Sequence, residues 1–312
     1  MNKNQIISRL LQMLIVLIGI SFITFLLTYL SPGDPARNVY THSGIMPTSE
    51  MIEEMRVTLG LNKPFFSQYM DWVLNCLQGN FGESFMLHKP VSELLMARLW
   101  PTLKLTLAST ILMLLFSVPL GVLSAVHHNK PIDYFVRAIT FFGVSIPNFW
   151  LGLMLILVFC VKMGLLPVVS SGADLESLIL PAVTLAVAMT AKYTRQVRTA
   201  VLEELHSDYV IGARARGVSE SKILWCNVLP NAMLPLITML GLSIGSLLGG
   251  TSVVEIIFSY PGLGNLAVAA ITSADYFLVQ GYVLWVSVIY MLINLIVDIS
   301  YYYIDPRMRL RR

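Results

Sequence analysis

The chain of 312 residues is 56% apolar and only 12% charged, and its formal net charge is +3. Its charged share is about half that of an average soluble domain, so the composition excludes an ordinary water-soluble protein. It has no basic soluble face, which excludes nucleic-acid binding, and the net positive charge indicates membrane topology and contact with anionic membrane lipid.

Six uncharged apolar runs follow one another and cover residues 10–30, 105–126, 138–161, 177–191, 223–254 and 276–297. About 20 helical residues cross the hydrocarbon core of a bilayer, so five of these runs are long enough to span it. The fourth run is shorter, but Lys192 and Arg195 can reach toward the head groups and extend it. The sequence therefore predicts an all-α integral membrane protein with six transmembrane helices, organised as one membrane domain over residues 1–312.

Basic residues predict the orientation of these helices. If the N-terminus is inside, the cytoplasmic segments hold 14 of the 21 Lys and Arg residues. The fourteen are Lys3, Arg9, Lys130, Arg137, Lys192, Arg195, Arg198, Arg214, Arg216, Lys222, Arg307, Arg309, Arg311 and Arg312. This bias follows the positive-inside rule, so we expect both termini in the cytoplasm.

The longest soluble segment, residues 31–103, is then an outer insert. Thr48 or Ser49 can cap a short helix that Gly60 ends, and a second helix begins after Pro64. The second helix carries one apolar stripe, formed by Phe65, Tyr69, Trp72 and Cys76. Both helices are amphipathic and too short to span, so we expect them to lie at the outer mouth or on the membrane surface.

A polar, basic segment over residues 192–222 separates the fourth and fifth apolar runs. Spanning the membrane does not require so long a polar cytoplasmic segment, so we predict that this segment contacts a partner protein. The predicted contact residues lie within residues 208–217, where arginines alternate with small residues. They are Tyr209, Ala213, Arg214, Ala215, Arg216 and Gly217.

Glycines recur every four residues at Gly241, Gly245 and Gly249 in the fifth run. Such a ridge lets another helix approach closely, or it widens a pathway. Glu255 closes the run, and an acid at membrane depth is costly unless it is paired or functional. A structural ion pair or cap is one reading of Glu255. The other places Glu255 with Gly249 and Gly250 near the outer end of a pathway.

Catalytic signals are missing from the sequence. No glycine-rich loop ends in Gly-Lys-Ser or Gly-Lys-Thr, so the chain has no familiar nucleotide-binding loop. No histidine has a second histidine four residues on with a glutamate, and the three cysteines have no zinc-site spacing. We therefore expect no enzyme activity, no metal site and no cofactor in this chain.

Several motifs together resemble ABC importer permeases of the dipeptide, oligopeptide and nickel family, in particular the "B" type subunits with a long first outer loop. The matching segments are 59–61, 81–84, 145–150, 208–217, 229–231, 249–258, 261–264 and 305–307. The segment over residues 208–217 is similar to the Glu-Ala-Ala loop that docks such permeases onto their ATPase. One departure is that Ile211-Gly212-Ala213 stands where the broader pattern begins with glutamate.

The resemblance implies the type I ABC importer architecture in a bacterial cytoplasmic membrane. Two permease chains would form the pathway, two ABC ATPases would bind inside, and an extracytoplasmic solute-binding protein would deliver the solute. The stretches at residues 47–51 and 59–72 look closer to nickel permeases, so nickel as a chelate is the predicted solute. Di- or oligopeptides are the alternative. A secondary transporter driven by an ion gradient is the rival class, but it would show inverted repeats and paired acids, which are not visible.

Overall fold

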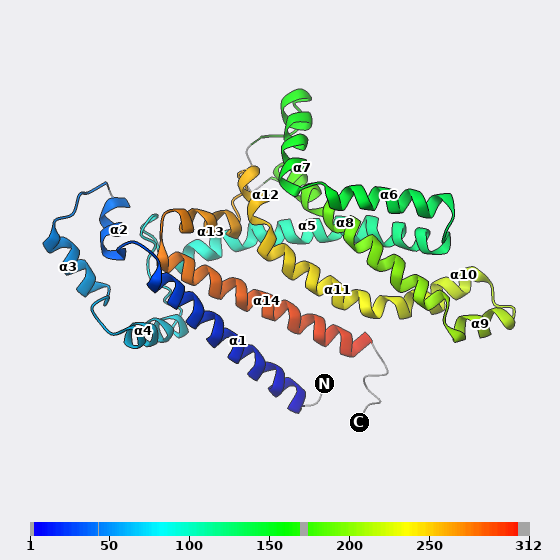
Figure 1. Ribbon diagram of the computed structural model, residues 1–312, viewed down its shortest axis with the longest axis horizontal. Helices are drawn as coiled ribbons and strands as arrows, with labels where there is room; N and C mark the ends of the chain where they lie inside the picture. The colour runs from blue at the N-terminus through cyan, green and yellow to red at the C-terminus, as the bar shows by residue number, and fades with distance from the viewer. Residues whose placement is uncertain (1–2, 43, 169–173, 305–312) are drawn as a thin grey trace. The chain divides into compact units, whose positions relative to one another are not determined.

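The computed structural model describes residues 3–42, 44–168 and 174–304, and these residues form helices and connecting loops, with one isolated bridge between Glu83 and Pro90 (Figure 1). The helices of the first half are α1 (Lys3–Leu30), α2 (Pro35–His42), α3 (Ser49–Thr58), α4 (Phe65–Leu77), α5 (Val91–Val126), α6 (Pro131–Ser145), α7 (Asn148–Leu155) and the π-helical η1 (Ile156–Lys162). Those of the second half are α8 (Leu175–Leu205), α9 (Asp208–Ala215), α10 (Glu220–Ile223), the π-helical η2 (Leu224–Val228), α11 (Leu229–Gly250), α12 (Ser252–Ile257), α13 (Leu263–Thr272) and α14 (Tyr276–Ile304). The predicted all-α class is confirmed.

Five helical stretches of the described residues are long and apolar enough to cross a membrane, and a bent pair of helices supplies a sixth. The five are Ile7–Leu30, Val91–Val126, Leu175–Leu205, Glu220–Leu247 and Tyr276–Ser300. The bent pair, α6 with α7 and η1, contains the third predicted run and turns by 94° at its break. Six spans are therefore present when this pair counts as one.

Proline explains the bend in the third run. Pro147 cannot donate a backbone hydrogen bond, and its ring disfavours a helical conformation in the residue before it. Ile146 accordingly adopts an extended backbone with φ −82° and ψ 122°, and α7 begins directly after the proline. A run that reads as one apolar segment is thus built as two helices.

The chain divides into two compact units, which we describe separately. Among the described residues, the larger unit lies within Leu103–Tyr260 and Leu292–Arg312, and the smaller unit lies within Asn2–Thr102 and Pro261–Met291. The larger unit has two apolar cores, one around Val197 and Val228 and the other around Leu185 and Phe258.

Glycines let the helices of the larger unit approach closely. A Cβ atom added to Gly121 of α5 would lie 2.6 Å from the Val197 side chain of α8. One added to Gly241 of α11 would lie 2.5 Å from the Val297 side chain of α14. Real Cβ atoms do not come so close, so these positions favour glycine, as in other membrane helix pairs. At Gly241 the close-packing reading of the glycine ridge is therefore confirmed.

The smaller unit contains the two helices predicted in the outer insert. Thr48 caps α3, because its Oγ1 accepts a hydrogen bond from the Met51 amide at 3.4 Å. The apolar stripe of α4 packs against Phe25 of α1, with Tyr69 and Trp72 buried in the cluster. The ring centroids of Phe25 and Tyr69 lie 5.5 Å apart in an edge contact, a favourable aromatic geometry. Capping and periodicity were therefore sufficient to predict these two helices.

In the smaller unit, a buried carboxylate joins the loop around residue 84 to the start of α14. Asp275 is fully buried and accepts hydrogen bonds from Ser84 Oγ at 2.6 Å and from the Met86 amide at 3.2 Å. Its second oxygen accepts from the Leu278 amide at 3.3 Å, in the first turn of α14. Ser84 closes the motif over residues 81–84, so one function of that motif is to fasten the loop to the start of α14.

Candidate functional site

The segment predicted to dock a partner forms a short helix, α9, which lies with α10 beyond the ends of α8 and α11 (Figure 1). Helix α8 continues through residues 192–205, so the first part of the polar segment extends the fourth span as a helix. The chain then turns at Ser207, which adopts an extended backbone before α9.

One face of α9 is anchored in the larger unit. Val210 is completely buried and Ala213 is 5% exposed, and both belong to the core cluster that includes Val201 of α8 and Val228 of η2. The two residues are three apart and so share a helix face. The small side chain of Ala213 therefore serves packing within this chain, and α9 is held as a rigid projection of α8 and α11.

Most other positions of α9, together with its C-cap residue Arg216, are exposed and carry the remaining predicted contact residues. Tyr209, Arg214, Ala215 and Arg216 are all exposed. Tyr209, which is 36% exposed, donates a hydrogen bond to Glu204 at 2.6 Å, and its partial burial together with that carboxylate raises the pKa of the tyrosine. Arg214 donates to Glu220 from Nε at 2.7 Å and from Nη2 at 3.1 Å, which raises the pKa of the arginine. Arg214 thus orders the turn after α9.

Gly217 makes that turn possible. Its φ is +78°, a left-handed conformation that costs little only for glycine. A Cβ atom added there would meet no other atom of the described chain within 4 Å. Glycine is therefore favoured here by the backbone conformation and not by crowding from other described residues.

A buried ion pair joins α6 to α8, the helix that leads into α9, and the sequence did not predict it. Asp133, in the first turn of α6, is fully buried, and Arg198 of α8 is about one-fifth exposed. Arg198 donates from Nε and Nη2 to the two carboxylate oxygens, each at 2.8 Å. The same carboxylate also accepts hydrogen bonds from Ser124 Oγ at 2.6 Å and from the Asn129 amide at 3.0 Å. Such bidentate, charge-assisted contacts hold α6 firmly against α8.

The residues predicted near the outer end of a pathway have different surroundings. Gly249 is exposed, with no atom within 4 Å of an added Cβ, and Gly250 is the last residue of α11. Glu255 lies on α12, is fully buried, and has its carbonyl bonded to the Tyr260 amide at 2.7 Å. The exposed glycine and the buried acid thus lie on successive helices, α11 and α12.

Comparison with known proteins shows which family this chain belongs to. Residues 117–310 match the family described as "Binding-protein-dependent transport system inner membrane component". Residues 3–106 match the corresponding N-terminal family, "Binding-prot-dependent transport system membrane comp, N-term". The chain belongs to this family of binding-protein-dependent transport components. It is therefore a multi-pass inner membrane protein and a permease subunit.

Relatives of this family component include named permeases. The "Glutathione transport system permease protein GsiC" of Escherichia coli (strain K12) is 40% identical over 307 residues, which cover 98% of this chain and 99% of the relative. The protein of the same name from Shigella dysenteriae serotype 1 (strain Sd197) has the same identity and coverage. The predicted family is therefore confirmed, whereas the closer likeness to nickel permeases has no support among these relatives.

Solved permease structures show the same fold. The inward-facing MetNI methionine ABC transporter is 21% identical, with a TM-score of 0.56 over 68% of this chain and 96% of that chain. An amino acid ABC transporter crystallised with histidines is 18% identical, with a TM-score of 0.51 over 69% of this chain and 94% of that chain. The predicted type I importer permease architecture is confirmed by these likenesses.

The Asp133–Arg198 pair of this transport component left only a weak signal in the sequence. Asp133 follows Pro131 at a helix start, where an acid is usually read as a favourable charge near the helix dipole. Arg198 is one of the fourteen basic residues that the predicted orientation places in the cytoplasm. The two positions are separated by 65 residues, and no local pattern joins them.

Proposed function

We propose that this chain is one of the two permease subunits of an ATP-driven importer for short peptides and peptide-like solutes. The observation that carries the proposal is the 40% identity to a glutathione transport permease over nearly the full length of both proteins. Glutathione is a peptide-like molecule, so this relative favours the peptide alternative over the nickel chelate.

The partners follow from the same proposal. A second permease chain completes the pathway, two ABC ATPases bind on the cytoplasmic side, and an extracytoplasmic solute-binding protein delivers the solute. Residues Tyr209 to Gly217 form the ATPase contact, for which the rigid seating of α9 and its exposed outer face give support. The termini are cytoplasmic, as the basic residues indicate, and the insert over residues 31–103 faces outward.

The mechanism is then mechanical. Closure of the ATPase dimer moves α9 as a rigid body, and this motion shifts the pathway between outward and inward access. The buried Val210 and Ala213 and the Asp133–Arg198 pair pass the motion into α8 and α6. Hydrolysis itself takes place on the ATPase.

Uptake measurements test the solute. In cells lacking this chain, we expect uptake of labelled glutathione or of a labelled tripeptide to fall to background, while uptake of ⁶³Ni²⁺ stays at the parental level. Re-expression of the chain should restore peptide uptake. Lost nickel uptake with normal uptake of both peptides would overturn the proposal and return the nickel reading to first place.

Cysteine accessibility tests the predicted outer end of the pathway. Gly249→Cys is expected to react with an impermeant thiol reagent, and Glu255→Cys to react slowly because the position is fully buried. Trapped nucleotide should change the rate at both positions. The exposed Cys226 is first replaced by serine, whereas burial raises the pKa of the Cys76 thiol to about 12 and keeps it protonated at pH 8. Rates that are the same in every nucleotide state would remove these residues from the pathway.

A further inference from the structure

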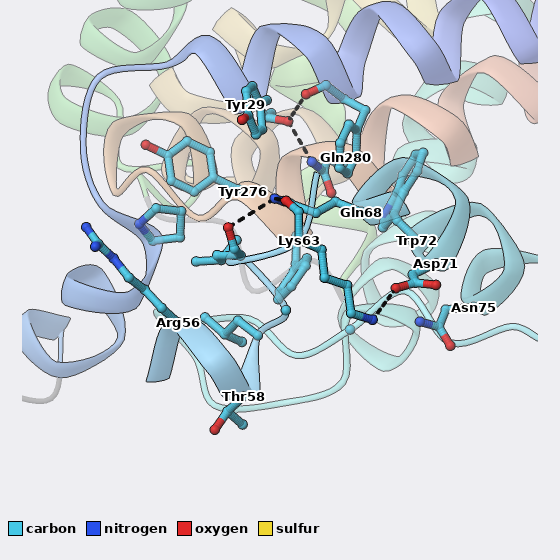
Figure 2. Close-up of a pocket in the computed structure, with 18 of the residues that line it drawn as sticks. Tyr29, Arg56, Thr58, Lys63, Gln68, Asp71, Trp72, Asn75, Tyr276 and Gln280 are labelled. Atoms are coloured by element: carbon cyan, nitrogen blue, oxygen red, sulfur yellow. Dashed lines mark hydrogen bonds and ion pairs between the residues drawn. The ribbon is translucent and has the colours of Figure 1, made fainter. Parts of the chain in front are cut away.

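The smaller unit contains a cavity of about 950 Å³, bordered by the end of α1, by α3 and α4, and by the start of α14 (Figure 2). Pockets for small ligands typically have volumes of about 300–1,000 Å³, so this one is large enough for a molecule of several residues. It lies largely within the proposed outer insert, which the docking and gate residues do not use.

Two buried polar atoms in the cavity wall have no hydrogen-bond partner among the residues that the structure describes. They are Trp72 Nε1, a donor, and Gln280 Oε1, an acceptor, on side chains that line the cavity. Trp72 is 6% exposed and Gln280 is 4% exposed. A buried polar group without a partner costs about 1–3 kcal/mol, so in native proteins such atoms are usually satisfied by a protein group, by ordered water or by a bound molecule.

The orientation of the Gln280 amide is fixed by its neighbour. Thr28 Oγ1 has the Thr24 carbonyl at 3.1 Å and the Phe25 carbonyl at 2.9 Å as acceptors for its single hydrogen, so it accepts from Gln280 Nε2 at 2.6 Å. The carbonyl oxygen of Gln280 is therefore the amide atom that has no partner among the described residues. Gln68 also lines the cavity, as Figure 2 shows, and its own Nε2 donates to the Lys63 carbonyl at 2.8 Å.

Charges of both signs stand at the edge of the same cavity. Lys63 Nζ lies 2.6 Å from Asp71, and Arg56 Nη2 lies 3.0 Å from Asp34. Figure 2 shows Arg56 well apart from the Lys63–Asp71 pair. Exposed ion pairs contribute only about 0–1 kcal/mol, so a ligand's ammonium and carboxylate groups can take the place of one member of each.

We propose that this cavity binds a short peptide or a peptide-like zwitterion on the permease itself. Trp72 Nε1 and Gln280 Oε1 are buried in the cavity wall as it stands, so binding must turn them toward the cavity, where Trp72 Nε1 donates to a ligand carbonyl and Gln280 Oε1 accepts from a ligand amide. Lys63 and Asp34 bind the ligand's carboxylate and ammonium groups. A ligand with amides and two opposite charges satisfies all four, which a purely apolar molecule or a simple cation does not. The inference rests on the proposed function for the solute class and for the outward face of the insert.

Direct binding tests this site. The complete importer, with both permeases and the ATPases but without the binding protein, is titrated in nanodiscs with reduced glutathione and with trialanine by calorimetry. Binding of at least one of the two is expected. Trp72→Phe, which keeps the ring and removes the donor, is expected to weaken Kd about tenfold, the loss of about one hydrogen bond. Trp150→Phe, outside the cavity, is the matched control and should leave Kd unchanged.

A second variant guards against misfolding. Lys63 is half-exposed, so Lys63→Met should fold normally and still weaken binding of the ligand carboxylate. Absence of binding to the parental importer, or equal Kd values for Trp72→Phe and Trp150→Phe, would overturn the site. If uptake through the binding protein is intact in that same preparation, the proposed function stands and only the site fails. If peptide uptake is absent as well, the proposed function fails.

Discussion

Replacing Asp133 by asparagine is expected to destabilise the larger unit by about 3–5 kcal/mol, because it leaves the Arg198 guanidinium largely buried without its counter-charge. The carboxylate is fully buried and takes part in four hydrogen bonds, two of them from Arg198. A neutral amide cannot accept with both terminal atoms, so at least one contact with the guanidinium becomes unfavourable. The expected readouts are a lower Tm of the purified protein and a reduced amount in the membrane.

A double-mutant cycle identifies the pair as the cause. Asp133→Asn with Arg198→Gln removes both charges, and it is expected to be more stable than either single variant. Glu220→Gln breaks the exposed pair with Arg214 and should cost less than about 1 kcal/mol, which makes it the matched control. Additive effects of the two single changes would show that the Asp133–Arg198 contact contributes little to the fold.

The position of this pair gives it a consequence for transport. Asp133 lies in the first turn of α6, and Arg198 lies seven residues before the end of α8, the helix that leads into α9. A charged pair held by short, directional bonds transmits displacement better than apolar packing alone, because its geometry tolerates little sliding. Lysine cannot bond both carboxylate oxygens as the arginine fork does. For the conservative Arg198→Lys variant we therefore expect the uptake rate to fall by a larger fraction than the amount of protein in the membrane.

The sequence predicted those parts of the fold that depend on local chemistry. Uninterrupted apolar runs located the spans, because a bilayer leaves a chain few alternatives to helices. The Thr48 cap and the stripe on α4 were predicted for the same reason: capping and helical periodicity act within a few residues. The orientation from basic residues and the docking role of α9 remain predictions.

Long-range contacts could not be predicted in this way. The cavity brings together Thr28, Lys63, Trp72 and Gln280, which lie far apart in the sequence. Each has an ordinary local explanation as a helix, cap or surface residue. Glu255 shows the same limit, because its place at the end of an apolar run did not reveal that it is fully buried. Such sites arise from tertiary packing, and local sequence patterns do not predict which helices pack against one another.

Gly217→Trp is expected to abolish coupling to the ATPase while the chain stays folded in the membrane. No atom of the described residues lies within 4 Å of the new Cβ, so the cost at the backbone is that of the left-handed conformation, about 1–2 kcal/mol. An indole that projects beside α9 would, in contrast, block a partner surface. Pull-down of the ATPase is expected to fall at least about tenfold, equivalent to about 1.4 kcal/mol of binding free energy, and uptake should fall with it.

Two glycine controls separate backbone strain from a clash with the partner. Gly217→Ala carries the same left-handed strain with almost no added volume, so we expect it to retain most of the pull-down. Gly164 has a φ of +62° and is also surrounded by open space, so Gly164→Trp repeats both strain and size far along the chain from α9. It should leave ATPase binding unchanged. Normal pull-down and uptake by Gly217→Trp, or equal losses in Gly217→Trp and Gly164→Trp, would show that this turn does not touch the ATPase. Only a selective loss in Gly217→Trp is consistent with a partner pressed against the exposed end of α9.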